Sequence, residues 1–89
     1  MTTNIQFNSK EIELMKTGQR LFIVMPLDKD KSNFPELSLW HVVIAKNNRV
    51  VNYIPDYSNG YDDQATALGF AKGFKDLSVD QPNIVVRDQ

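Results

Sequence analysis

The fold is decided by residues 39–77, which read LWHVVIAKNNRVVNYIPDYSNGYDDQATALGFAKGFKDL. Two apolar runs flank Asn47-Asn48, and asparagine tolerates the positive φ angles that a two-residue type I′ turn requires. A second turn, at residues 57–60, leads into a segment whose apolar residues have helical spacing. The stretch therefore predicts a β-hairpin followed by a helix that packs back onto the sheet.

A two-residue turn also sets the register of the hairpin, and with it the face on which each side chain lies. The predicted pairs are Ala45 with Val50, Ile44 with Val51, Val43 with Asn52, and Val42 with Tyr53. Side chains alternate between the two faces of a strand. One face is then expected to carry Trp40, Val42, Ile44, Val51 and Tyr53, and the other His41, Val43, Ala45, Val50, Asn52 and Ile54.

The helix is expected to run from Gln64 to Leu77, with Asp62 or Asp63 capping its first turn. The apolar stripe expected to face the sheet comprises Ala67, Phe70, Ala71, Phe74 and Leu77. A second ridge contains only the small residues Ala65, Gly69 and Gly73. Glycine inside a helix costs about 1 kcal/mol relative to alanine, so both glycines need a reason. The two hypotheses are a backbone lying close on the sheet and the close approach of a partner helix, such as that of a symmetry mate.

The N-terminal part predicts a second, short helix after a frayed segment of residues 1–6. Asn8 can cap this helix, and Glu11 stands three residues later, as a capping box requires. Gly18 is the expected left-handed terminator, which gives a helix of about nine residues. So short a helix needs tertiary contacts, and we expect Ile12, with Met15 or Leu14, to supply them.

Two further apolar runs predict strands. Residues 21–25 are apolar at every position, which is typical of a strand buried on both faces, and Pro26 is expected to stop it. Residues 84–86 form a short final strand after the break at Pro82. The chain is thus predicted to be one α+β domain of order α-β-β-β-α-β. In it, an antiparallel sheet of three to four strands carries the long helix on one face.

Composition excludes several classes of protein. The chain has 89 residues, of which 42% are hydrophobic and 24% charged, as in an ordinary globular domain. It has no cysteine, which excludes disulfide scaffolds, thiolate zinc sites and cysteine nucleophiles. The first residues lack the pattern of a signal peptide, and no apolar run is long enough to cross a membrane. We therefore expect a cytoplasmic protein.

Residues able to carry chemistry are few. His41 is the only histidine, and its place among apolar strand residues favours a structural role over acid–base catalysis. Phosphate-binding, dinucleotide-binding and nucleophile motifs do not occur. Asp28, Asp30 and Ser32 alternate like the start of a calcium loop, but Leu39 stands where such a loop needs a glutamate. The sequence therefore predicts a non-enzymatic protein without a cofactor, with a small metal-dependent protein as an alternative.

Aromatic residues indicate a protein-binding surface. Tyr53, Tyr57 and Tyr61 recur at every fourth residue around the second turn, and tyrosine gives a large contact area with a polar tip. The predicted protein-binding set consists of Trp40, Phe34, Asp62 and these three tyrosines. We expect an inhibitor, an adaptor or a small accessory subunit, a size class common among phage and mobile-element proteins. The sequence leaves the oligomeric state open, and a homo-oligomer paired through the hairpin edge or the glycine ridge is a further hypothesis.

Basic residues supply the alternative of nucleic-acid binding. Lys46 and Arg49 flank the hairpin turn, and Lys72 and Lys75 lie on the long helix. Nucleic-acid binders usually concentrate such residues on one face, whereas the net charge here is −1 and is evenly spread along the chain. Protein binding is therefore the preferred hypothesis.

Overall fold

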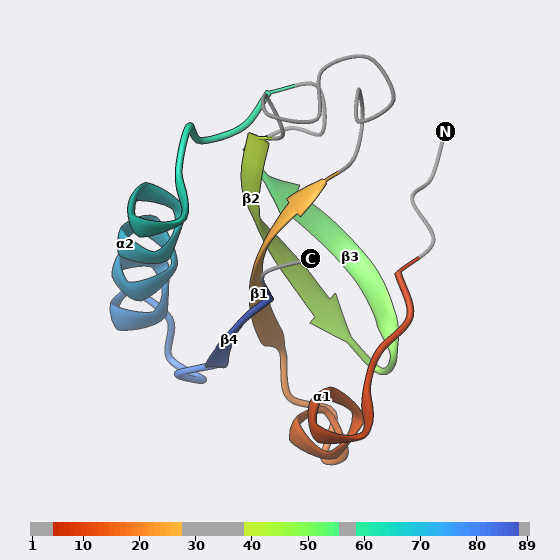
Figure 1. Cartoon of the computed structure of the whole chain (residues 1–89). Helices are drawn as coiled ribbons and strands as arrows, with labels where there is room; N and C mark the ends of the chain where they lie inside the picture. The colour runs from red at the N-terminus through yellow and green to blue at the C-terminus, as the bar shows by residue number, and fades with distance from the viewer. Residues whose placement is uncertain (1–4, 28–38, 56–58, 88–89) are drawn as a thin grey trace.

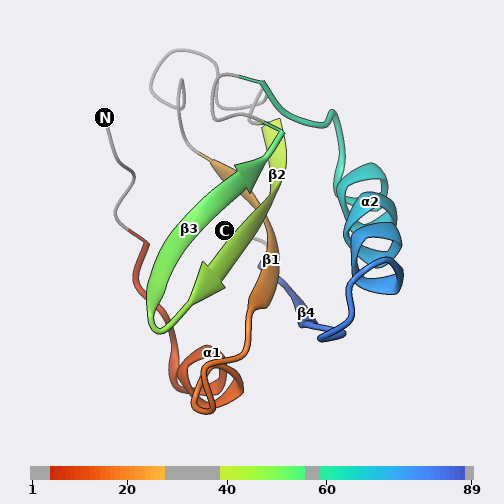
Figure 2. The same cartoon turned by 180° about the vertical axis from the view of Figure 1, so that it is seen from behind.

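The computed structural model describes residues 5–27, 39–55 and 59–87. Its elements are α1 (Ser9–Leu14), β1 (Leu21–Leu27), β2 (Leu39–Lys46), β3 (Arg49–Ile54), α2 (Gln64–Asp76) and β4 (Asn83–Val86). Figures 1 and 2 show one sheet with α2 on one side of it and α1 beside the β2–β3 turn. The α+β class and the order α-β-β-β-α-β are confirmed.

The sheet is mixed rather than wholly antiparallel. Its strand order is β3-β2-β1-β4, in which β1 pairs with β2, and β2 with β3, antiparallel, while β4 pairs with β1 in parallel. The parallel pair arises because α2 carries the chain back to the end of the sheet at which β3 begins. A strand that follows such a crossover runs in the same direction as the strand before it, and β1 already runs in that direction.

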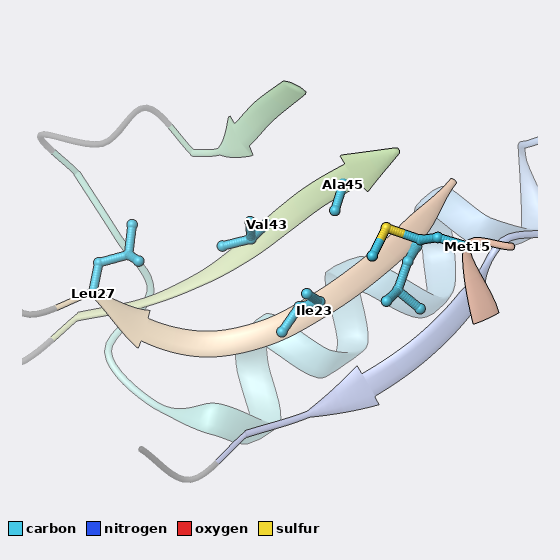
Figure 3. Close-up of a cluster of buried hydrophobic side chains, with 6 residues drawn as sticks. Met15, Ile23, Leu27, Val43 and Ala45 are labelled. Carbon is cyan, nitrogen blue, oxygen red and sulfur yellow. The ribbon is translucent and has the colours of Figure 1, made fainter. Parts of the chain in front are cut away.

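The central strand β1 separates two apolar clusters, as its uninterrupted apolar run predicts. On the α2 side, Phe22 and Val24 are buried with Val42 and Ile44 of β2 and with two alanines of α2. On the other side the buried cluster consists of Met15, Leu21, Ile23, Leu27, Val43 and Ala45. Figure 3 shows Met15 extending toward Ile23 and Ala45 in this second cluster. Each face of the sheet thus has its own helix, and α1 reaches its face through Met15.

The hairpin has the predicted turn but not the predicted register. Asn47 and Asn48 have φ angles of 54° and 63°, as a type I′ turn requires, and Ala45 pairs with Val50 as expected. A bulge then shifts the register, so that the next pairs are Ile44 with Asn52, Val43 with Tyr53, and Val42 with Ile54. The extra residue is Val51, which is 53% exposed. Because the bulge moves all later side chains of β3 to the opposite face, Tyr53 lies on the α1 side and Ile54 on the α2 side.

The capping box of α1 is confirmed, but the helix is shorter than expected. The Asn8 side chain accepts a hydrogen bond from the Glu11 N–H, and the Glu11 side chain accepts one from the Asn8 N–H. Gly18 has the expected left-handed backbone, with φ at 79°. The helix is capped already at Met15, and Met15 is buried whereas Ile12 is exposed. The expected contact through Ile12 is therefore wrong.

Two expectations about the ends of elements are also wrong. Ile5, expected to fray, packs against the apolar cluster on the α1 side, and the Gln6 carbonyl accepts a hydrogen bond from Arg87. β1 continues through Pro26 to Leu27. Pro26 is tolerated because its nitrogen points to the side on which β4 pairs with β1, and that pairing extends along β1 only to Val24.

Candidate functional site

The long helix α2 places a different set of side chains against the sheet than its apolar stripe predicts. Ala67 and Ala71 are fully buried, and Leu68 and Phe74 pack beside them. Phe70, however, is 47% exposed and Leu77 is 86% exposed, so these two members of the predicted stripe do not face the sheet. The small alanines bring the helix close to the sheet, and the helix is turned so that larger apolar residues remain outside.

The residues left outside form an apolar groove along the outer face of α2. The groove has a volume of about 410 Å³ and is lined by Ala65, Thr66, Gly69, Phe70, Gly73, Phe74 and Leu77. A Cβ atom added at Gly69 or Gly73 would meet no atom within 4 Å in the described part of the chain. The hypothesis that these glycines let the helix lie close on the sheet is therefore wrong. The close approach of a partner helix stays as the other hypothesis.

An aromatic row borders the N-terminal end of the groove. The rings of Tyr61 and Phe70 are stacked with centroids 4.7 Å apart and planes 8° from parallel, and Phe70 and Phe74 are tilted at 6.1 Å. Tyr61 is held to β2 by two backbone hydrogen bonds with Trp40, each 2.8 Å long, and burial raises the pKa of the Tyr61 phenol. The Phe70 ring is therefore half-exposed and is packed against Tyr61 on one side.

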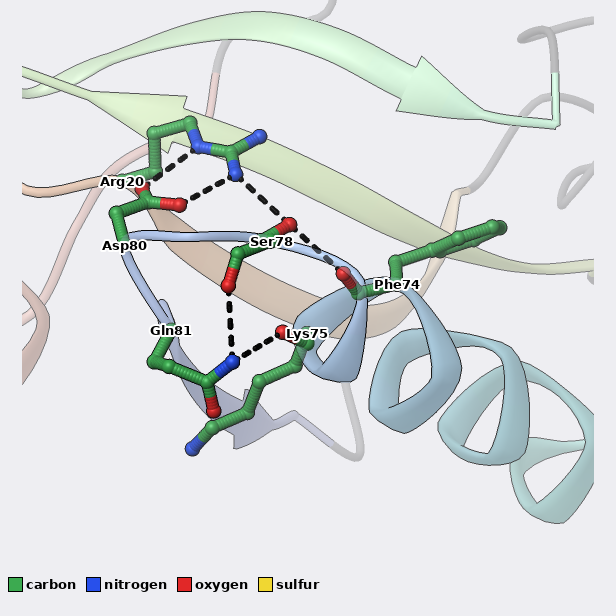
Figure 4. Close-up of polar contacts among 6 residues, drawn as sticks. All are labelled: Arg20, Phe74, Lys75, Ser78, Asp80 and Gln81. Carbon is green, nitrogen blue, oxygen red and sulfur yellow. Dashed lines mark hydrogen bonds and ion pairs between the residues drawn. The ribbon is translucent and has the colours of Figure 1, made fainter.

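The C-terminal end of the groove is fixed by hydrogen bonds after α2 (Figure 4). The Ser78 hydroxyl donates to the Phe74 carbonyl at 2.7 Å, and the Gln81 side-chain amide donates to the Lys75 carbonyl at 2.9 Å. Arg20 donates to both oxygens of the Asp80 carboxylate, at 3.0 Å and 2.8 Å. This bidentate contact, rather than burial, holds the pKa of Asp80 below its ordinary value. The segment that carries Leu77 is thus tied to the start of β1.

The connection into α2 depends on Gly60, which the sequence predicts only as the last residue of the second turn. A Cβ atom at this position would lie 2.3 Å from Leu39 Cβ and 2.9 Å from His41 Cε1. Real Cβ atoms do not come this close to another Cβ, so only glycine fits without a shift of the backbone. Gly60 therefore allows Tyr61 to reach Trp40 and to stack on Phe70, which lines the groove.

The predicted protein-binding residues do not lie on one surface. Trp40 and Tyr61 are neighbours on the α2 side, and Asp62 is exposed just before Asp63, which caps α2 through the Thr66 N–H. Tyr53 packs on the opposite side of the sheet. Tyr57 and Phe34 lie outside the described residues.

The predicted basic residues lie at the hairpin tip and on α2. Lys46 and Arg49 are exposed beside the turn, Lys72 is exposed and Lys75 is half-buried. Ala45, next to Lys46, pairs with Leu21, and the neighbouring Arg20 binds Asp80, so the hairpin tip lies near the segment after α2. Asp76 follows Lys75 directly in the sequence, so acidic and basic residues are mixed in this part of the chain.

Catalytic and metal-binding groupings have little support in the described ranges. His41 is buried, with Nδ1 3.2 Å from the Leu39 carbonyl oxygen. Within residues 5–27, 39–55 and 59–87, no three histidine, aspartate or glutamate side chains are grouped so that they can hold a metal ion. Asp28, Asp30 and Ser32 lie outside these ranges. The helices described here are too short or too polar to cross a membrane.

Comparison of the chain with protein-family models, with curated proteins and with solved structures gives no match.

Proposed function

We propose that this chain is a non-enzymatic, cytoplasmic protein-binding domain, an inhibitor, adaptor or small accessory subunit, whose binding surface is the outer face of α2. The observation that carries this proposal is the apolar groove with Gly69 and Gly73 in its floor. The protein-binding residues expected from the sequence contribute to it through Tyr61, which stacks on Phe70.

The two glycines support the proposal because they weaken the helix and have no role in the packing described. Each costs about 1 kcal/mol relative to alanine, and a small domain has only ~5–10 kcal/mol of net stability. Alanine fits both positions within the described chain. A partner that packs directly on the helix backbone would, in contrast, require glycine there.

The exposed apolar side chains support the same conclusion. Leu77 and Phe70 flank the glycine floor and are 86% and 47% exposed. Full burial of an exposed leucine is favourable by about 1.5–3 kcal/mol, and burial of the exposed half of Phe70 adds a smaller gain. Phe70 is held against Tyr61, so ordering it on binding costs little side-chain entropy. Aromatic residues, phenylalanine among them, are enriched at protein interfaces relative to the rest of the surface.

The first prediction is that Leu77→Arg weakens specific binding without unfolding the domain. An arginine at this border would place a charge in the apolar groove, and we expect an affinity loss of about tenfold or more. Leu77 is almost fully exposed, so the melting temperature should stay within about 2 °C of wild type. The measurement is affinity capture from the native host with the tagged chain, followed by titration of the captured protein.

The matched control is Val79→Arg. Val79 is fully exposed, lies two residues further on, and does not line the groove. Proteins lost with Leu77→Arg but retained with Val79→Arg bind the outer face of α2. Equal capture by both variants would contradict the proposed surface. Binding to generic duplex DNA that falls steeply with salt, and that is lost on changing Lys46 and Arg49, would instead favour the nucleic-acid hypothesis.

A further inference from the structure

We propose that the folded chain carries a site of spontaneous deamidation at Asn59-Gly60, in the connection that leads into α2. The reaction turns the Asn59 side-chain amide into a carboxylate and requires only water. This inference does not depend on the proposed function, because it concerns the chemistry of the connection and not what binds the helix.

The residue that follows Asn59 makes this amide reactive. Asparagine is a thermolabile residue, and its deamidation begins when the backbone nitrogen of the next residue attacks the asparagine Cγ to close a five-membered imide. A side chain on the attacking residue hinders that approach, whereas glycine leaves it open and has the backbone freedom that ring closure needs. Asn59 is the only asparagine in the sequence that a glycine follows.

The fold leaves both reacting groups available. Asn59 is exposed and lies outside the helices and strands. Among the described residues, neither the Asn59 side chain nor the Gly60 N–H makes a hydrogen bond. The attack of Gly60 N on Asn59 Cγ therefore does not require any hydrogen bond described for the native chain to break.

The fold also fixes the glycine on which the reactivity depends. A Cβ atom at residue 60 would lie 2.3 Å from Leu39 Cβ and 2.9 Å from His41 Cε1. A larger residue at position 60 would protect Asn59, but it would disturb the packing of the connection against β2. The reactive pair thus follows from the close packing of Gly60, and it is removed without cost to the fold only at Asn59.

The reaction needs no oxidant and no second substrate besides water. The bond from Gly60 N to Asn59 Cγ forms, the bond from Cγ to the side-chain nitrogen breaks, and that nitrogen leaves as ammonia with the proton from Gly60 N. Water then opens the imide at either of its two carbonyls. Opening at Cγ gives aspartate, and opening at the main-chain carbonyl gives isoaspartate, which makes the main chain one atom longer just before Gly60. Either product adds one carboxylate near Asp62 and Asp63 and takes the net charge from −1 to −2.

Two other asparagines serve as internal controls. Asn48 is exposed in the hairpin turn, but it is followed by Arg49, whose side chain hinders the attack. Asn8 is exposed and precedes the small Ser9, but its Oδ1 accepts a hydrogen bond from the Glu11 N–H at 2.8 Å. The need to open this cap slows the reaction at Asn8 by about twofold to thirtyfold.

Incubation of the purified full chain at mildly alkaline pH, followed by ion exchange and peptide mass spectrometry, tests the proposal. A more acidic form should accumulate, with aspartate and isoaspartate at residue 59 and with Asn48 and Asn8 largely unchanged. The conversion should be faster at higher pH, because the attacking nitrogen must lose its proton. Asn59→Gln, whose longer side chain closes a larger ring far more slowly, should give none of this acidic form and should melt within about 2 °C of wild type.

The same incubation in guanidinium chloride gives the rate for the unfolded chain. Conversion of Asn59 in denaturant but not in buffer would show that the packed Gly60 holds its nitrogen away from Asn59 Cγ, and would overturn the inference. Conversion of Asn48 or Asn8 as fast as that of Asn59 in the native chain would also overturn it. Neither outcome bears on protein capture through Leu77, so this inference and the proposed function fail separately.

Discussion

Gly60→Ala is expected to destabilise the domain by about 3 kcal/mol. The new Cβ would lie 2.3 Å from Leu39 Cβ, an atom fixed to the backbone at the start of β2. Rotation of a side chain cannot relieve that overlap. Either β2 or the connection into α2 must move, and the movement would disturb the Trp40–Tyr61 hydrogen bonds.

The matched control is the same substitution at Gly69. There the methyl group meets open space in the described structure, and alanine is the better helix former, so Gly69→Ala should stabilise the monomer by about 0.5–1 kcal/mol. Urea unfolding at low protein concentration measures both. The two variants should shift the midpoint in opposite directions. A Gly60→Ala variant as stable as wild type would show that the connection adapts without cost.

The contrast between these glycines shows what sequence reasoning misses in this fold. Gly69 and Gly73 interrupt a helix, so their local cost is visible in the sequence. Gly60 lies in a connection where glycine is common, and its need for space depends on Leu39, 21 positions earlier in the chain. Close approach between distant segments leaves no local pattern.

Features that depend on neighbouring residues were predicted well. The Asn47-Asn48 turn, the Asn8–Glu11 capping box and the Asp63 cap all follow from local hydrogen bonding or from the φ preference of asparagine. The bulge at Val51 was not predicted. Val50 and Val51 are the same residue type, and only the pairing of β3 with β2 decides which of the two is left unpaired. That one residue moved Tyr53 away from Tyr61.

The candidate site was predicted only in part, for a similar reason. The outward-facing apolar residues of α2 and those that face the sheet both satisfy helical periodicity. The sheet selects Ala67 and Ala71, because small residues allow closer packing of the helix, and Phe70 and Leu77 then remain exposed. Of the predicted aromatic set, Tyr61 lies at this surface, where it stacks on Phe70.

Arg87→Ala is expected to cost about 3–5 kcal/mol, because it leaves the buried Glu11 carboxylate without its cation. Glu11 is only 2% exposed. Arg87 Nε donates to Glu11 Oε2 at 2.8 Å, and Arg87 Nη2 donates to Glu11 Oε1 and to the Gln6 carbonyl. The two bonds to Glu11 join the residue after β4 to α1, across 76 positions of sequence. Denaturant unfolding at neutral pH measures the loss.

A companion variant separates the lost cation from the lost packing. Glu11→Gln retains an oxygen that can accept the Asn8 N–H bond of the capping box but carries no charge. The double variant Glu11→Gln/Arg87→Ala should therefore be more stable at neutral pH than Arg87→Ala alone. If the double variant is the less stable of the two, the cost of Arg87→Ala does not come from an unpaired buried charge.

The pH dependence provides the sharper test of the same ion pair. Burial acts to raise the pKa of Glu11, but the hydrogen bonds from Arg87 and Asn8 and the charge of Arg87 outweigh it and hold the pKa below its ordinary 4.5. The unfolded chain therefore takes up the proton first as the pH falls. The stabilisation is complete at neutral pH and declines below about pH 4.5, toward the lower pKa of the folded state.

Removal of Arg87 should reverse the direction in which the contribution of Glu11 to stability changes with pH. Burial then acts on Glu11 without its cation and raises the folded pKa above that of the unfolded chain, so that Arg87→Ala gains stability, relative to wild type, as the pH falls. The other carboxylates with lowered pKa values, Asp63 and Asp80, are common to both proteins and cancel in the difference. Unfolding free energies of wild type and Arg87→Ala should therefore converge between pH 7 and pH 3. A constant difference over that range would mean that Arg87 stabilises the fold through contacts other than its ion pair with Glu11.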